Sequence, residues 1–385
     1  MHIRHLDYQL QTHFNTYKQA LILLGARQVG KTTLLKRIFP QAHYLLLDNQ
    51  STKNIFESYD INTYRQVLGK YQQIILDELH LLSNPGRAVK IIYDQLPGIQ
   101  LIVTGSSSFH IKNKTSESMA GRKIDYHLYP LTFSEYLTQT KIEAQLNYNI
   151  LDNIVQGVTP QKRLFKASEI SNSHLLYGLY PETLQLPQDR QYLYNLSDSV
   201  VFKDLLELNL IDNKTKAKQL LKLLAYQIGN LVNYSELANK LRIDQRTVQR
   251  YLDIFEESFI TYRLYPYSNN KRGEIVKSPK IYFWDLGLRN ALINNFEDYS
   301  LRADSGAMFE NFIITEVKKI NSYQNKPYQL HYWRTKSGSE VDLVLSKTDT
   351  LIACEIKQQK GNISQAFLNR YPHAQSHVVT RSNFY

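Results

Sequence analysis

The segment that most constrains this chain is a short apolar run followed by a glycine loop and a helical pattern. ALILL leads into GARQVGKT at residues 25–32, which fits G-x-x-x-x-G-K-S/T, and TTLLKRIF continues as a helix. Glycines let the backbone fold around a phosphate group, so that successive N–H groups and the helix N-terminus face its oxygens. The order strand, loop, helix therefore predicts a phosphate-binding turn at one end of a buried strand.

The residue types in this loop specify a nucleotide–metal complex. Lys31 can reach the β- and γ-phosphates, and the hydroxyl of Thr32 can bind Mg²⁺. We therefore expect ATP and Mg²⁺ as cofactors. The predicted nucleotide-binding residues are Gly25, Ala26, Arg27, Gln28, Val29, Gly30, Lys31, Thr32, Thr33 and Ser106.

Three further apolar runs, HYLLLD, QQIILDE and QLIVTG, alternate with helical stretches up to about residue 137. That alternation predicts a parallel α/β sheet. QQIILDE places Asp77 to bind Mg²⁺ and Glu78 to orient and deprotonate the attacking water, although adjacent carboxylates after a strand can also be a simple helix cap. Thr104 and Ser106 follow the last strand as candidate phosphate sensors, or as residues that satisfy local turns.

Length, charge and cysteine content narrow the class of protein. The chain has 385 residues, more than one hydrophobic core usually serves, so several domains are expected. Its formal net charge of +11 favours a polyanionic partner, nucleic acid or an acidic membrane face, although a plain basic surface is also compatible. One cysteine, no secretory signal pattern and no apolar run near the ~18 residues of a membrane span predict a cytoplasmic protein without membrane insertion.

Five segments together, GARQVGKTTLL, LDELHLL, VTGSSS, MAGR and YPLTFSEYL, resemble prokaryotic AAA-type ATPases with an additional C-terminal domain. Ala26 stands where these proteins commonly have proline. The resemblance implies that Arg122 reads the γ-phosphate, either within its own chain or from a neighbouring subunit, which would make a homo-oligomer. An ordinary surface or salt-bridging role for Arg122 is the alternative.

The segment from residue 233 to residue 267 shows two short amphipathic patterns joined by RID, with Asp244 as the N-cap of the second. The segment resembles a winged helix-turn-helix. The resemblance implies that Arg242, Arg246 and Arg250 contact nucleic acid, DNA rather than RNA. Such modules also serve as ATPase lids or protein-docking surfaces, and the sequence is compatible with either role.

The last part of the chain has a helical pattern with Glu310, followed by three strand-like runs. Its order of a helical Glu, a VD pair and E-x-K resembles the PD-(D/E)-x-K phosphodiesterases. The resemblance implies that Asp342 and Glu355 bind one or two Mg²⁺ ions, that Lys357 stabilises developing charge and that Glu310 completes the shell. The competing interpretation is a fold that has lost catalysis and serves as a scaffold.

These expectations divide the chain into an AAA-type ATPase unit with a helical extension at 1–205, a winged-helix module at 206–268 and a restriction-endonuclease-like α/β unit at 269–385. Glu78, Arg122, Glu310, Asp342, Glu355 and Lys357 are the predicted catalytic residues. ATP turnover would then drive action on nucleic acid. The competing hypothesis is a nucleotide-switched signalling or docking ATPase with an inactive nuclease-like scaffold.

Overall fold

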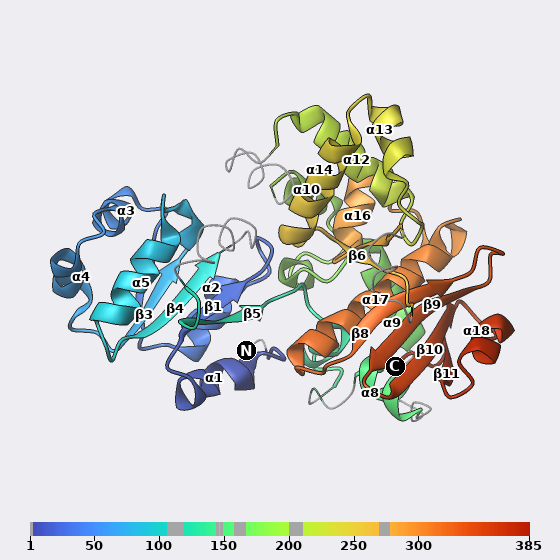
Figure 1. The fold of residues 1–385 in the computed structure, drawn as a ribbon, viewed down its shortest axis with the longest axis horizontal. Helices are drawn as coiled ribbons and strands as arrows, with labels where there is room; N and C mark the ends of the chain where they lie inside the picture. The colour runs from blue at the N-terminus through green and yellow to red at the C-terminus, as the bar shows by residue number, and fades with distance from the viewer. Residues whose placement is uncertain are drawn as a thin grey trace.

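The computed structural model describes residues 3–105, 119–143, 146, 149–157, 167–199, 211–268 and 278–385. Three groups of elements follow one another along the chain (Figure 1). A sheet flanked by helices comes first, a mainly helical group lies between, and a second sheet with one long helix comes last. In the described part of the chain, no helix is both long and apolar enough to cross a membrane.

The first group forms a five-stranded parallel sheet in the order β2-β3-β4-β1-β5. Its elements are α1 (Asp7–Thr16), β1 (Ala20–Leu24), α2 (Lys31–Ile38), β2 (His43–Leu46), α3 (Gln50–Glu57), α4 (Ile61–Leu68), β3 (Gln73–Asp77), η1 (Leu79–Leu81), α5 (Pro85–Gln95), β4 (Gln100–Gly105) and β5 (Lys123–His127).

The parallel α/β sheet predicted from the apolar runs is confirmed, and all four runs are strands. Every residue of β1 is buried, because β1 lies inside the sheet between β4 and β5. Central parallel strands are covered on both faces, so they consist of continuous apolar residues. The sequence prediction missed β5, an edge strand with the polar and only partly buried sequence KIDYH.

The middle group is mainly helical. Its elements are α7 (Phe133–Gln139), α8 (Ile150–Gln156), α9 (Ala167–Tyr177), η2 (Pro181–Leu184), α10 (Arg190–Asp198), α12 (Lys214–Tyr226), α13 (Tyr234–Leu241), α14 (Gln245–Glu257), β6 (Thr261–Leu264), β7 (Lys280–Phe283), α16 (Leu286–Ile293) and η4 (Tyr299–Leu301).

The helix pair expected within residues 233–267 is present as α13 and α14, and Asp244 caps α14 by accepting from the amides of Arg246 and Thr247. β6 then pairs antiparallel with β7. That pairing crosses the expected boundary between residues 268 and 269, because β7 lies beyond it. The β6–β7 ladder and the helices before it therefore share one structural unit, whereas the domain boundaries themselves stay predictions.

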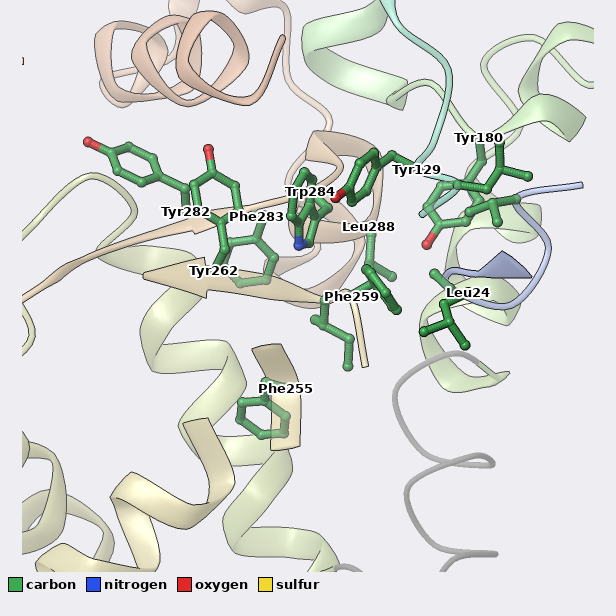
Figure 2. Packing of buried hydrophobic residues seen from close by; sticks show 14 of the residues in the cluster. Leu24, Tyr129, Tyr180, Phe255, Phe259, Tyr262, Tyr282, Phe283, Trp284 and Leu288 are labelled. Carbon is green, nitrogen blue, oxygen red and sulfur yellow. The ribbon is translucent and has the colours of Figure 1, made fainter. Parts of the chain in front are cut away.

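Aromatic side chains join the first and middle groups (Figure 2). Tyr129, just after β5, stacks on Trp284 with ring centroids 4.2 Å apart, and Phe259 and Tyr262 lie close by from the β6 side. Tyr180 lies on the other side of Tyr129 in the same view. The core is therefore continuous between the sheet and the helical group.

The last group is a four-stranded sheet in the order β11-β10-β9-β8, with α17 packed against β10. β8, β9 and β10 are antiparallel neighbours and β11 runs parallel to β10. The three expected strand runs are β8 to β10. The elements are α17 (Ser305–Tyr323), β8 (Gln329–Arg334), β9 (Glu340–Lys347), β10 (Thr350–Lys357), α18 (Gln365–Arg370) and β11 (Gln375–Thr380).

Candidate nucleotide site and C-terminal ion cluster

The glycine loop has the shape that its sequence predicts. Gly30 has φ +91°, a conformation that side chains of L-residues rarely adopt, and it immediately precedes α2. A Cβ on Gly25 would lie 2.2 Å from the carbonyl oxygen of Leu128. Both positions therefore require glycine, one for backbone conformation and one for close packing against the chain after β5.

Two polar side chains of the loop have contacts that suit a phosphate and a metal. Lys31 is 6% exposed, and its ammonium donates to the carbonyls of Gly25 and Ala26, both at 2.9 Å. Thr32 donates to Asp77 Oδ2 at 2.7 Å. A hydroxyl beside a carboxylate is a donor set that Mg²⁺ accepts, so these residues fit the ion.

Asp77 is held at the end of β3 by three hydroxyl groups. Besides Thr32, Tyr44 donates to Oδ2 at 2.6 Å and Thr104 donates to Oδ1. Burial and this bond to Asp77 raise the pKa of the Tyr44 phenol, so the phenol remains a donor. Sequence reasoning missed Tyr44. Tyr44 could have been found as a residue with a hydroxyl group in the strand next to β3, on the same face of the sheet as Asp77.

Glu78 takes up an unusual backbone conformation directly after Asp77. Its φ of 60° lies in the left-handed region, which costs a non-glycine residue about 1 kcal/mol or more. Its amide donates to Thr104 Oγ1 at 3.3 Å, and its carboxylate lies 3.1 Å from His80 Nδ1. The turn directs the Glu78 side chain to the wall of a cavity above the glycine loop.

That cavity has a volume of about 590 Å³. Glu78 and most of the predicted loop residues line it, but Gly25, Ala26 and Val29 do not, and Ala26 and Val29 are buried in the core instead. Ser106 lies outside the described residues. The lining residues are Arg4, Arg27, Gln28, Gly30, Lys31, Thr32, Thr33, Leu34, Arg37, Glu78, Leu131, Gln139, Pro181, Glu182, Gln185, Leu186 and Tyr192.

The segment YGLYPETL, residues 177–184, lines this cavity from the helical group through Pro181 and Glu182. Asp285 fixes its course by accepting from the amide of Leu179 at 2.6 Å. Gly178 has φ +75°, and a Cβ there would lie 2.2 Å from the Asp285 carboxylate. A glycine and a proline mark this turn in the sequence, but they carry no information about what the turn faces.

Arg4 is a second residue that sequence reasoning missed. It is 5% exposed, donates to the carbonyls of Val29 and Tyr129, and forms an ion pair of 3.1 Å with the fully buried Glu135. It therefore connects the N-terminal segment to the glycine loop. Nothing in the local sequence around Arg4 indicates these partners, which lie 25, 125 and 131 positions along the chain.

The position of Arg122 does not fit a contact with a γ-phosphate bound to its own chain. It directly precedes β5, and its carbonyl accepts from the amide of Ala20, the first residue of β1. This is the amino edge of the parallel sheet, whereas the glycine loop follows the carboxyl end of β1. Arg122 donates to Asp94 at 2.7 Å. The expected γ-phosphate contact within its own chain is therefore wrong. The Asp94 contact fits the salt-bridging alternative, and contact from a neighbouring subunit stays a proposal.

The predicted nucleic-acid residues lie on and between α13 and α14. Arg242 ends α13 in a left-handed conformation, with φ 53°, and Arg246 is exposed in the first turn of α14. Arg250 forms an ion pair with Asp212, which neutralises part of its charge. Of the three arginines, Arg250 therefore already has a partner within the chain.

Three of the four C-terminal residues expected to form one site are in contact. Lys357 donates to Asp342 at 3.1 Å and lies 2.6 Å from Glu355, as expected for alternate residues on one strand face. Glu310 is bonded elsewhere, to Lys280 at 3.1 Å and to the Tyr282 hydroxyl at 2.6 Å. The expectation that Glu310 completes a metal shell with Asp342 and Glu355 is therefore not supported.

Burial raises the pKa of Glu355, and the nearby Asp342 raises it further. Glu355 Oε2 is buried and has no hydrogen-bond partner. In the described residues, no group of three or more histidine, cysteine, aspartate or glutamate side chains could hold a metal ion. An orphaned carboxylate oxygen beside Asp342 still fits a cation bound by two carboxylates.

The fold and the loop define the first group as a P-loop nucleotide-binding unit: a parallel sheet with the phosphate loop after its central strand and two carboxylates after β3. Residues 17–137 match the family model described as an AAA domain, so this part of the chain is similar to AAA domains. Residues 168–299 and 305–384 match two models described as domains of unknown function.

Similar whole chains are uncharacterized proteins. One from Methanocaldococcus jannaschii is 28% identical over 86% of this chain and 74% of its own length. One from Haemophilus influenzae is 22% identical over 87% and 81%, and one from Mycobacterium tuberculosis is 24% identical over 88% and 70%. The alignments cover most of both chains, so the three groups occur together in these relatives.

Among solved structures, a Walker-type ATPase of Pyrococcus abyssi superposes with a TM-score of 0.46 at 14% identity, over 76% of this chain and 96% of that one. DnaA from Aquifex aeolicus bound to AMPPCP superposes with a TM-score of 0.27 at 15% identity, over 66% and 86%. Superpositions at these scores carry no argument about function.

Proposed function

We propose that this chain binds Mg²⁺ and ATP in the cavity above the glycine loop and hydrolyses the bond between the β- and γ-phosphates. The observation that carries the proposal is the contact between Thr32 and Asp77, 2.7 Å long, beside Lys31 and with Glu78 on the wall of the same cavity. Phosphate-binding, metal-binding and water-activating groups are thus gathered from separate segments of the chain. The AAA domain match to residues 17–137 supports the same activity.

Each residue has a distinct role in this proposal. Lys31 leaves the carbonyls of its own loop and pairs with phosphate oxygens. Thr32 and Asp77 would hold Mg²⁺, which offsets negative charge on the phosphates. Glu78 accepts a proton from water as the water oxygen bonds to the γ-phosphorus and the bond from that phosphorus to the β–γ bridging oxygen breaks.

Two substitutions separate these roles. Lys31→Ala should lower ATP affinity by at least about a hundredfold, since a charge-assisted phosphate contact is lost. Glu78→Gln should retain ATP but reduce turnover by about a hundredfold or more, because an amide does not accept the proton. Binding is measured by calorimetry and turnover by phosphate release. Replacing an exposed lysine, Lys90→Ala, is the matched control and should change neither.

The result that refutes the proposal is specific. If wild-type protein shows no ATP affinity, the site is not a nucleotide site. If Glu78→Gln hydrolyses ATP at the wild-type rate, the water-activating role belongs to another residue. Far-UV circular dichroism of each variant excludes global unfolding as the cause of a loss.

We further propose that nucleic acid, DNA rather than RNA, is the partner of α13 and α14. The support is the net charge of +11 and the exposed position of Arg246 at the start of a capped helix, where side chains can approach phosphates. The β6–β7 pair after α14 is compatible with a winged helix. ATP turnover would then control what the chain does to that nucleic acid.

Cleavage by the C-terminal group is a second candidate, favoured by the meeting of Asp342, Glu355 and Lys357. Asp342→Ala and Lys357→Ala would each abolish Mg²⁺-dependent cleavage and leave ATP binding intact. Incubation of the wild type with labelled single- and double-stranded DNA and RNA, with and without ATP and Mg²⁺, tests it. If nothing is cleaved with Mg²⁺ or Mn²⁺, the group serves as a scaffold in a docking ATPase.

A further inference from the structure

A buried lysine lies within the C-terminal carboxylate cluster. Lys280, the first residue of β7, is only 3% exposed. Its ammonium lies 2.5 Å from Glu340 Oε1 and 3.1 Å from Glu310 Oε1, with the ring of Tyr332 5.6 Å away. No sequence feature singled it out, because it stands 30 residues before Glu310 and belongs to the β6–β7 pair.

Lys280 carries a positive charge in this position. Burial alone would lower the pKa of its ammonium, but the carboxylates of Glu310 and Glu340 raise it above its usual value. Buried charges persist when they are paired in this way. Lys280 therefore supplies a permanent cation at neutral pH to two carboxylates that come from α17 and β9.

The remaining contacts show which carboxylate oxygens of the cluster already have partners. Asp342 Oδ2 accepts from Lys357 and from the amide of Ile356 at 2.8 Å, and Glu355 Oε1 pairs with Lys357. Glu310 Oε1 accepts from Lys280 and Tyr282. Glu355 is 8% exposed, and its Oε2 has no partner. A cation can thus be shared by Asp342 and Glu355, while Lys280 already occupies the space beside Glu310.

We propose that Lys280 is a built-in cation that takes the place of a second divalent ion, so that the C-terminal cluster binds one divalent cation, through Asp342 and Glu355 and without Glu310. The proposal concerns the same group as the second candidate function. Its test measures metal binding in the absence of nucleic acid. A failure of this proposal can therefore be distinguished from an absence of cleavage.

The proposal is tested by measuring Mn²⁺ binding to the full chain in the absence of nucleotide. Binding is followed by calorimetry and by the loss of the paramagnetic resonance signal of free Mn²⁺. Asp77→Asn serves as the background, because it removes the carboxylate partner of Thr32 from the other metal site. One ion per chain is expected in this background, and Asp342→Asn should abolish its binding. Two ions, or no bound ion, would overturn the proposal.

Changes at Lys280 and Glu310 supply the decisive comparison. Lys280→Met should raise Mn²⁺ affinity at least about tenfold, since a unit positive charge that interacts with Asp342 is removed, whereas the charge-retaining Lys280→Arg should not. Glu310→Gln should retain Mn²⁺ binding and weaken it by no more than the roughly tenfold expected for loss of a neighbouring unit charge, because Glu310 is not a ligand. Loss of Mn²⁺ binding in Glu310→Gln contradicts the proposal even if Lys280→Met fails to fold.

Discussion

Thr104→Val separates two explanations of the residue at the end of β4. Thr104 is fully buried, donates to Asp77 and accepts from the amide of Glu78, so it positions both carboxylates before any nucleotide binds. Valine has nearly the same shape and removes only the hydroxyl. A phosphate sensor would instead act only when ATP is present.

The magnitude follows from these two bonds. A hydrogen bond to a charged acceptor contributes about 1.5–3 kcal/mol, and the substitution also leaves the Glu78 amide without its acceptor. Local opening of β3 and β4 should therefore become about 10- to 150-fold more frequent in Thr104→Val. Thr104→Ser keeps the hydroxyl and should remain near the wild type.

Hydrogen exchange read by mass spectrometry on peptides from β3 and β4, in nucleotide-free protein, measures this opening. Tryptophan fluorescence is unsuitable because both tryptophans, Trp284 and Trp333, lie outside the first sheet. Unchanged exchange in Thr104→Val, together with lost ATP turnover, would refute the positioning role and favour the phosphate sensor.

The remaining predictions address three other parts of the chain. Arg4→Met should destabilise the fold by about 3–5 kcal/mol in urea unfolding, since it leaves Glu135 buried without its cation, and Arg4→Met with Glu135→Gln should recover part of the loss. Replacing Arg246 and Arg250 by alanine should weaken DNA binding and lower the salt slope by about one unit per lost phosphate contact; a wild-type slope would indicate a docking surface. Burial lowers the pKa of His174 to about 3, so neutral His174 favours the folded state, and stability should fall as pH drops from 6.5 toward 3. His174→Phe should flatten that decline in thermal unfolding measured at each pH.

Local patterns predicted the parts of the site that follow strands. The loop from Gly25 to Thr32 and the pair Asp77 and Glu78 could be placed because the carboxyl ends of neighbouring parallel strands meet at one edge. Asp244 could be assigned as a helix cap because its chemistry depends on residues two and three positions away.

Contacts between distant segments could not be predicted in this way. Arg4, Tyr44 and Lys280 acquire their importance from partners on other elements, and no periodicity or spacing encodes such pairs. The contact of Arg122 with a γ-phosphate in its own chain could not be excluded from the sequence, because the unrecognised strand β5 sets which edge of the sheet Arg122 occupies. The antiparallel pairing of β6 with β7 was also missed, because it joins two segments that are separated in the sequence.

The turn fixed by Gly178 and Asp285 has a consequence for how such chains can evolve. One wall of the cavity is the phosphate loop and another is the segment after Gly178, which belongs to the region matched by a different family model. A transplanted AAA domain would arrive with an incomplete binding site. We therefore expect a substitution at Gly178, far from the phosphate loop in sequence, to alter the wall of the same cavity.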